Sequence, residues 1–245
     1  MTVYVFLGPT MAREDAAEIL DAVFLPPVAQ GDVIRIAEHK PTAIAIVDGY
    51  FECVPAVWHK EILFAIRRGI TVFGASSMGA LRAAELHPFG MIGVGSIFEA
   101  YRDGRLEDDD EVAVVHGPAE LGYTMLSEAM VNIRRTLADA EAEGVLSPAT
   151  TRALEGIAKE LPYRERGYGR MLRLACEMGM DARELARFKG WLPTGRVDQK
   201  REDAKLLLHT VRRWLGRAPV LPEPRFHFEH TALFERAVRE AARAA

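Results

Sequence analysis

Three short runs in the first third of the chain contain almost only apolar, β-prone residues, and they constrain the fold more than any other feature. They span residues 3–7, 43–47 and 70–73. Helical periodicity separates them, at residues 13–23 and 55–68. A strand without polar positions must be covered on both faces, as in parallel sheets flanked by helices. The sequence therefore predicts an α/β domain with a small, mostly parallel sheet in a Rossmann-like arrangement.

Two weaker strands complete the predicted sheet. Residues 33–36 form a second candidate strand, and residues 112–115 form a later one whose direction the pattern leaves open. Between them, residues 74–86 have the composition of a sharp turn that leads into a helix. We place the α/β core at residues 1–125.

The chain changes character after this core. A helical region is expected over residues 126–216, followed by a proline-rich linker and a C-terminal helix within residues 217–245. The helices expected in these two parts cover residues 126–142, 148–159, 169–178, 181–189, 197–215 and 231–244. Pro219, Pro222 and Pro224 would make the linker stiff. We expect the core to hold any chemistry and the helical part to bind a partner.

The charge balance and the apolar runs exclude some partner classes. With 31 Lys and Arg against 35 Asp and Glu, the net charge of −4 argues against nucleic acid as the main partner. No apolar run reaches the ~18 residues of a membrane span, and the apolar N-terminus lacks the basic region of a signal peptide. Cys53 and Cys176 lie far apart without further metal ligands nearby, which predicts two buried thiols in a reducing compartment. We expect a soluble, cytoplasmic protein that binds no membrane.

A pair of serines follows the third apolar run. The stretch Ala75-Ser76-Ser77-Met78-Gly79 nearly matches the G-x-S-x-G elbow, in which small residues flank a serine on a strand-to-helix turn. The small residues favour Ser77 over Ser76 as the projecting serine. The N–H groups of Met78 and Gly79 would then face a developing oxyanion. The alternative is a plain helix N-cap, a position that serine favours.

The helix predicted at residues 55–68 supplies a candidate base. Val57, Lys60 and Phe64 share one face at spacings of three and four residues, which puts Lys60 among apolar side chains. A lysine in such surroundings can release its proton and act as a general base toward a serine. The alternative is a lysine whose charged end reaches solvent from the helix edge. His59 is adjacent, but a packed, satisfied histidine is the commoner case.

Other candidate sites carry weaker signals. The acidic run at residues 107–111 offers oxygen ligands for Mg²⁺, but adjacent acids cannot all converge on one ion. A solvated edge or a docking surface is favoured, and we expect no metal. Gly8 and Thr10 follow the first strand, and Asp48 and Gly49 follow a later one, at the edge where α/β proteins bind ligands. The first of these loops lacks the P-loop pattern, so no nucleotide cofactor is expected.

Several segments, taken together and in this order, resemble the TfuA-like protein family. The resemblance is strong from the N-terminus to about residue 145 and diffuse beyond it. The segments that carry it are residues 6–10, 26–27, 30–33, 48–51, 57–62, 74–86, 89–91, 93–95 and 108–114, with 199–204 as a further match. No single motif among them is diagnostic, but their fixed order identifies the chain as a member.

The resemblance implies a function that the spacing of residues does not show. Proteins of this family work beside YcaO enzymes, which use ATP to activate an amide of a ribosomal peptide or protein and yield a thioamide. The TfuA-like partner is understood to hydrolyse a ThiS-type sulfur carrier that ends in a thiocarboxylate, and to help YcaO engage its peptide. The family's Ser–Lys pair corresponds here to Ser77 and Lys60. His59 and Arg82 join the cleft candidates, and the family's fold, described as unusual, adds a non-Rossmann topology to the prediction.

We therefore expect a hydrolase that releases sulfide from the carrier. Lys60 would accept the proton of Ser77, and Ser77 or a water that it positions would attack the thiocarboxylate carbon. The competing expectation is a non-catalytic adaptor that docks YcaO and its peptide. An ordinary esterase would need a His–acid pair, and the sequence positions no acid beside His59 or His116.

Overall fold

The chain of 245 residues forms two compact units. The computed structural model describes residues 1–52, 54–217 and 226–243. The first unit comprises residues 1–107 together with 201–245, and the second comprises residues 108–200. The boundaries predicted after residues 125 and 216 differ from these, because the first unit takes up the chain again at residue 201.

The first unit is built on a five-stranded sheet. Its strands are β1 (Val3–Phe6), β2 (Val23–Leu25), β3 (Ala43–Ile46), β4 (Thr71–Ala75) and β5 (Ile92–Val94). They pair in the order β2-β1-β3-β4-β5, and every pair is parallel. This is the strand order of flavodoxin-like doubly wound folds, in which the chain order reverses between β1 and β3. The predicted α/β class with a mostly parallel sheet is confirmed.

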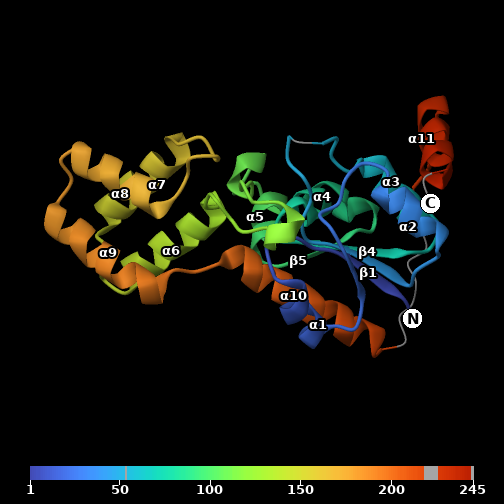
Figure 1. Cartoon of the computed structure of the whole chain (residues 1–245), viewed down its shortest axis with the longest axis horizontal. Helices are drawn as coiled ribbons and strands as arrows, with labels where there is room; N and C mark the ends of the chain where they lie inside the picture. Colours follow the sequence, from blue (N-terminus) through green and yellow to red (C-terminus); the bar gives the residue numbers. More distant parts are fainter. Residues whose placement is uncertain (53, 218–225, 244–245) are drawn as a thin grey trace. The chain divides into compact units, whose positions relative to one another are not determined.

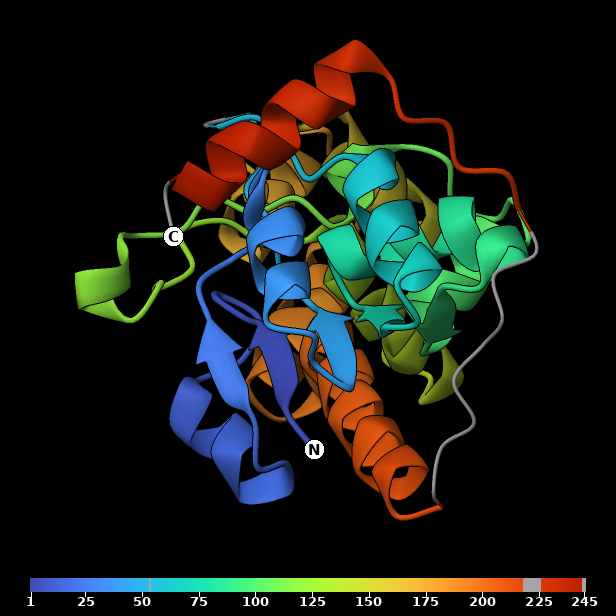
Figure 2. The same ribbon diagram turned by 90° about the vertical axis from the view of Figure 1, so that its right-hand side faces the viewer.

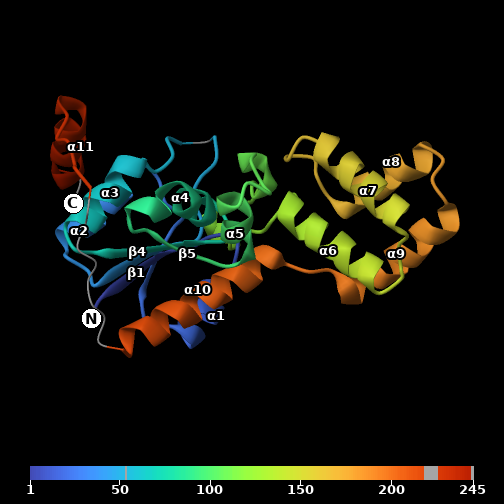
Figure 3. The same ribbon diagram turned by 180° about the vertical axis from the view of Figure 1, so that it is seen from behind.

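Helices cover both faces of the sheet (Figures 1 and 3). On one face lie α2 (Asp32–Glu38), α3 (His59–Arg67) and α4 (Met78–Leu86). On the other lie α1 (Arg13–Ile19) and α10 (Gln199–Leu215), whose apolar side chains share a core with those of β1, β3 and β4. The second face of the sheet is therefore closed by a helix that follows the whole second unit in the chain.

Helix α10 also holds the start of α5 (Ser96–Arg102). The carboxylate of Asp203, on α10, accepts the N–H of Ile97 at 2.8 Å and the hydroxyl of Ser96 at 3.3 Å. Gly95 makes this approach possible, since it has φ of 96° and a Cβ there would lie 2.4 Å from Cγ of Asp203. The diffuse family match at residues 199–204 thus contains a residue that fastens α10 to the sheet domain.

The strand predicted at residues 33–36 is wrong, because that segment is helix α2. Gly31 takes a left-handed φ of 90°, and the Asp32 carboxylate accepts the N–H of Ala29 at 2.7 Å, so the chain turns into a helix. The run of β-branched residues there reflects burial of one helix face. The true second strand, β2, begins at the last residue of the helix predicted at 13–23, which in fact ends at residue 19.

Two other predicted elements also differ. The helix predicted from residue 55 begins at His59, because Glu61 Oε1 accepts the N–H of Trp58 at 3.3 Å and so sets the helix start. The strand predicted at residues 112–115 is wrong. A short 3₁₀ turn (Asp109–Glu111) precedes that segment, which carries no strand in the structure. Neither β5 nor α5 is expected from the sequence.

The second unit is helical. It contains α6 (Met130–Ala142), α7 (Pro148–Glu160), α8 (Tyr168–Glu177) and α9 (Ala182–Gly195), which confirms four predicted helices. Their apolar faces form one core that includes Ile133, Leu137, Leu154, Met171 and Phe188. The helices expected at residues 197–215 and 231–244 are present as α10 and α11 (Ala232–Arg243).

The thiol prediction fails at Cys176, which is exposed on α8. Cys53 lies outside the described residues, and so do the linker prolines Pro219, Pro222 and Pro224. None of the helices in the described part of the chain combines the length and the apolar character that a membrane crossing requires.

Candidate active site

The carboxyl ends of β1 and β3 meet where the chain order of the sheet reverses, which is where doubly wound folds bind ligands. Asp48 follows β3 there and is only 1% exposed. Its carboxylate accepts the N–H groups of Gly8 and Thr10, at 2.9 and 3.1 Å, and the Thr10 hydroxyl at 2.6 Å. These three predicted cleft residues are therefore brought together, but they satisfy one another. They form a fixed wall and offer no free reactive group.

Two glycines let the chain pack tightly at this edge. A Cβ on Gly8 would lie 2.4 Å from Cγ of Pro27, and a Cβ on Gly49 would lie 2.7 Å from Cγ of Met78. Distances that short leave no space for a side chain. Gly49 therefore lies against the first residue of α4, which brings the loop after β3 next to the serine turn.

The serine turn itself is sharp and strained. β4 ends at Ala75 and α4 begins at Met78. Between them Ser76 has φ of 67°, and the N–H of Ser77 donates to the carbonyl of Ala75 at 2.9 Å, so the chain makes a γ-turn around Ser76. Such a backbone costs about 1 kcal/mol or more for a residue other than glycine. The elbow predicted from the small residues is present.

Ser77 occupies the N-cap position of α4, yet its side chain makes no capping hydrogen bond. The residue is 2% exposed, and its hydroxyl has no hydrogen-bond partner within the described part of the chain. Ser77 therefore holds the predicted N-cap position without the side-chain hydrogen bond of a capping residue, and its hydroxyl forms no hydrogen bond within the described part of the fold.

The two expected oxyanion donors differ in the structure. The N–H of Gly79 donates to the carbonyl of Val47 at 3.2 Å, so the prediction of this group as an oxyanion donor is wrong. The N–H of Met78 is the first of α4, and it has no acceptor among the described residues. It follows Ser77 directly, and the positive end of the helix dipole adds to its effect on an anion.

Replacing Ser76 with glycine is expected to raise the free energy of unfolding by about 1 kcal/mol. Glycine adopts a φ of 67° without steric cost, and the change removes a hydroxyl that is buried without a partner. Urea unfolding of the two proteins measures the difference. Ser76→Val should shift the midpoint in the opposite direction, because a β-branched residue fits poorly at positive φ. Equal or lower stability of the glycine variant would contradict strain at this turn.

Lys60 reaches the same edge of the sheet from α3. It is the second residue of that helix, which starts on the side of the sheet where β3 ends and α4 begins. Its Nζ lies 3.3 Å from Oγ1 of Thr231 and 5.5 Å from the ring centroids of Phe228 and Phe234. No hydrogen bond joins Lys60 to Ser77 in the described structure. The hydrogen bond and the ring contacts of this amine are thus with the C-terminal segment of the chain.

His59 and Arg82 are used to join α3 to α4. His59 Nε2 lies 2.7 Å from Glu85 Oε2, Arg82 Nη1 donates to the same oxygen at 2.8 Å, and Arg82 Nε donates to the carbonyl of Val57. Burial alone would raise the pKa of Glu85, but the hydrogen bonds from His59 and Arg82 outweigh it and lower that pKa. The structure thus places an acid beside His59, contrary to the sequence prediction. Glu85 lies eight residues beyond Ser77, or about 12 Å along the helix, so this pair is not positioned as its base.

Glu61 is a buried acid beside Lys60 that the sequence motifs do not reveal. It has no exposed surface, and its two carboxyl oxygens accept the N–H of Gly31 at 2.9 and 2.8 Å. It also borders a cavity of about 410 Å³ together with Arg35 and Ala241. Burial raises the pKa of Glu61 to about 7, against the lowering effect of the hydrogen bonds from Gly31 and Trp58.

The free energy of unfolding is expected to fall as the pH rises from about 5 to 7, and Glu61→Gln should remove this slope. Because the pKa of Glu61 rises from 4.5 to about 7, the folded state binds more protons than the unfolded state in that range. The stabilisation is complete below the unfolded pKa and is lost as the pH passes the folded one, on the order of 1 kcal/mol per pH unit. Urea unfolding at several pH values measures it. If the free energy of unfolding changes equally with pH in the wild-type protein and in Glu61→Gln, the pH dependence does not come from Glu61.

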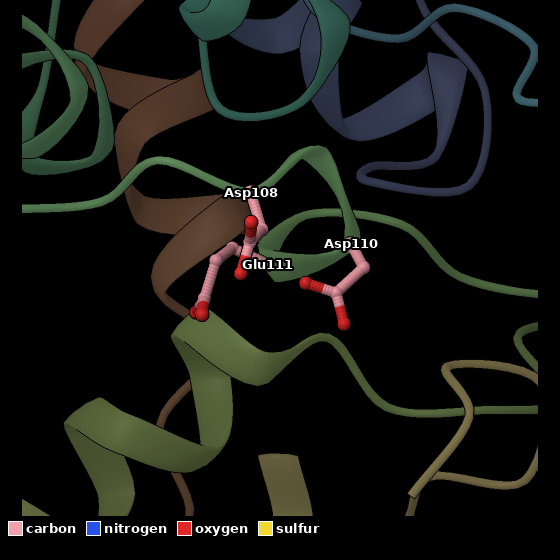
Figure 4. Close-up of side chains that lie close together, drawn as sticks. All are labelled: Asp108, Asp110 and Glu111. Carbon is pink, nitrogen blue, oxygen red and sulfur yellow. The ribbon is translucent and has the colours of Figure 1, made fainter. Parts of the chain in front are cut away.

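The acidic run is partly buried and paired with cations, whereas a solvated edge or a docking surface was expected. Carboxylates of Asp108, Asp110 and Glu111 gather within 4.8 Å of one another (Figure 4). Lys159 Nζ lies 3.0 Å from both Asp108 and Glu111 and also contacts Asp110. Arg166, fully buried, adds an ion pair to Asp110 at 2.7 Å. The run therefore fastens the start of the second unit to α7 by an ion-pair network.

Comparison with known proteins finds one family whose model covers the segment that contains most of these features. The family model described as TfuA-like protein matches residues 48–167 of the chain. That segment includes Lys60, the serine turn, all of α4 and the acidic run. A search of curated proteins finds no match. This match identifies residues 48–167 of the chain as TfuA-like.

Proposed function

We propose that this protein hydrolyses the thiocarboxylate of a ThiS-type sulfur carrier and releases sulfide for peptide thioamidation. The TfuA-like match associates the chain with YcaO-type thioamidation. The observation that carries the proposal is the Ser77 hydroxyl beside the N–H of Met78 at the start of α4, since neither has a hydrogen-bond partner among the described residues. A nucleophile and an oxyanion donor are thereby one residue apart.

The reaction exchanges sulfur for oxygen at the carrier's C-terminal carbon. The Ser77 oxygen, or a water that it positions, adds to the thiocarboxylate carbon, and the resulting oxyanion faces the Met78 N–H. The carbon–sulfur bond then breaks and sulfide leaves without strong acid assistance. In sum, the thiocarboxylate and one water give a carboxylate and hydrogen sulfide. If Ser77 attacks directly, a second addition by water frees the acyl-serine.

Lys60 acts in this scheme as the base that accepts the Ser77 proton. It starts α3 at the edge of the sheet where Ser77 starts α4, and the proposal requires its flexible side chain to swing from Thr231 toward Ser77. The histidine on the same helix is paired with the carboxylate of Glu85, whereas Lys60 has no carboxylate partner among the described residues. Lys60 is therefore the better base candidate on α3.

The surroundings of Ser77 suit an extended chain end better than a bulky substrate. Ser77 is only 2% exposed, so a substrate must reach it through a narrow opening. Gly8 lets its loop pack against Pro27, and Gly49 lets the loop after β3 pack against the Met78 side chain at the start of α4. A carrier that ends in a thin, extended tail fits this restriction, since its last carbon can enter without side chains beside it.

The direct test is to incubate the full-length protein with a thiocarboxylated carrier and to follow sulfide with a selective electrode. We expect sulfide release that is faster than spontaneous hydrolysis, with one carrier carboxylate formed per sulfide, as measured by mass spectrometry. A small aryl ester serves as the control substrate and should turn over poorly, because it lacks the extended tail. Sulfide release at the spontaneous rate would contradict the proposal.

A non-catalytic adaptor is the second candidate function. The observation that favours it is the compact helical unit at residues 108–200, which contains neither Lys60 nor Ser77. Leu121 and Leu126, which are 67% and 69% exposed, give this unit apolar contact points. Thioamide formation by YcaO that survives Ser77→Ala but not Leu121→Asp together with Leu126→Asp would favour the adaptor.

A further inference from the structure

The C-terminal helix lies across α3, which carries the proposed base, and its neighbour α2. In Figure 2, α11 crosses α2 and α3 on the outer side of the sheet domain. Phe234 is 1% exposed and Ala241 is 6% exposed, and both pack against Ile34 of α2. Phe234 also meets Phe64 of α3 edge to face, with ring centroids 5.4 Å apart. This segment therefore has a defined place on α2 and α3.

The contacts of Lys60 are made by this segment. Two aromatic rings, those of Phe228 and Phe234, lie 5.5 Å from Nζ, and Thr231 Oγ1 accepts its hydrogen bond at 3.3 Å. The two rings also meet each other, with centroids 5.3 Å apart. The C-terminal segment thus surrounds the Lys60 amine with two rings and a hydroxyl and holds it in a fixed position.

That position conflicts with the role of a base. A base must lie within hydrogen-bond reach of the hydroxyl from which it takes a proton. Lys60 in these contacts donates its hydrogen bond to Thr231, while the Ser77 hydroxyl has no partner in the described structure. Lys60 must leave the C-terminal segment before it can serve Ser77.

The attachment of this segment is thin enough to be reversible. Its apolar contacts come from one stripe of the helix, while the opposite side carries exposed ion pairs between Arg236 and Glu240 and between Arg239 and Glu235. Leu233, beside Phe234 in sequence, is 60% exposed and does not belong to this apolar cluster. Exposed ion pairs of this kind contribute little to stability. A few apolar side chains therefore hold the whole helix.

We infer that residues 226–243 form an autoinhibitory cover over Lys60, and that the site becomes active when this cover is displaced. The inhibitory effect rests on the proposed function. The cover itself concerns only how accessible the Lys60 amine is, and it can be tested separately. It gives the YcaO partner or the loaded carrier a means to switch on sulfide release only where sulfide is used.

The test compares three full-length variants with the wild-type protein. Phe234→Ala removes the main anchor of α11, and Phe228→Leu keeps apolar volume but removes one of the two rings beside Nζ of Lys60. Leu233→Ala is the matched control on the exposed side of the same helix. Two quantities are measured in each protein. One is the rate at which a trace amine-acetylating reagent modifies Lys60, relative to exposed Lys40, by mass spectrometry, and the other is sulfide release from the thiocarboxylated carrier.

Phe234→Ala is expected to raise both Lys60 acetylation and sulfide release about tenfold, because a buried phenylalanine anchors most of the contact. Phe228→Leu should raise both by a smaller factor, and Leu233→Ala should leave both unchanged. Unchanged acetylation of Lys60 in Phe234→Ala would overturn the inference that residues 226–243 cover this amine. Raised acetylation with an unchanged or lower rate of sulfide release would overturn the inhibitory role of this cover. Raised acetylation with no sulfide release from any protein would instead contradict the proposed reaction and leave the cover supported.

Discussion

Replacing Ser77 with alanine is expected to lower the rate of sulfide release about a thousandfold or more while leaving the fold intact. The hydroxyl would be lost as nucleophile or as the group that positions water, whereas the N–H of Met78 would remain. Because the hydroxyl has no hydrogen bond within the described residues, its removal should change the free energy of unfolding by less than about 0.5 kcal/mol. Turnover under saturating carrier and urea unfolding measure the two quantities.

The matched control is Ser76→Ala, which removes the neighbouring hydroxyl. Ser76 has no exposed surface, so a substrate cannot reach its side chain in this conformation. Sulfide release by this variant should stay within a few-fold of the wild-type rate. Loss of activity in Ser76→Ala together with normal activity in Ser77→Ala would show that our account assigns the reaction to the wrong serine.

The second large effect is expected on stability, from Gly79→Ala. A Cβ at this position would lie 1.8 Å from the carbonyl oxygen of Ile46 and 2.6 Å from its carbonyl carbon. Both are backbone atoms of β3, in the middle of the sheet, so the strand cannot move aside. Helix α4 would have to lift from the sheet, at a cost of about 3 kcal/mol or more in the free energy of unfolding. Urea unfolding of the variant measures it.

Gly156→Ala provides the matched control. Gly156 lies inside α7, and a Cβ there would have no neighbour within 4 Å. Alanine should therefore stabilise this helix by up to about 1 kcal/mol, since it is the better helix former. Opposite signs for the two glycine substitutions would show that close packing decides the effect at position 79. Equal effects would mean that α4 does not lie as close to β3 as described.

The sheet could be predicted from sequence where local pattern and tertiary role agree. β1, β3 and β4 are buried on both faces, so their sequences are apolar throughout and stand out from the flanking helices. The serine turn was predictable for a related reason. A sharp turn packed against backbone requires small residues. A Cβ on Gly74 would lie 2.2 Å from the carbonyl oxygen of Gly79.

Prediction failed where distant contacts override the local pattern. The β-branched residues of α2 resemble a strand, but a left-handed glycine and an aspartate start a helix, and α11 covers its outer side. β5 is only three residues long and half exposed, so it has too few apolar positions to be recognised. In both cases the deciding interactions come from elsewhere in the chain.

The candidate site shows the same division. Ser77 and Lys60 could be singled out by residue type and by position on their helices. The partners of Lys60 are separated from it by about 170 residues in sequence, and no local pattern records such a contact. The pairing of His59 with Glu85 likewise depends on the packing of α3 against α4.

Central to the account is that Ser77 and Lys60 act as one unit in carrier hydrolysis. The most direct measurement is the rate of sulfide release from thiocarboxylated carrier by Ser77→Ala, Lys60→Gln and the double variant. Groups that act together are not additive, so the double variant should be no slower than the slower single variant. Losses that multiply in the double variant, or wild-type rates in either single variant, would contradict the account.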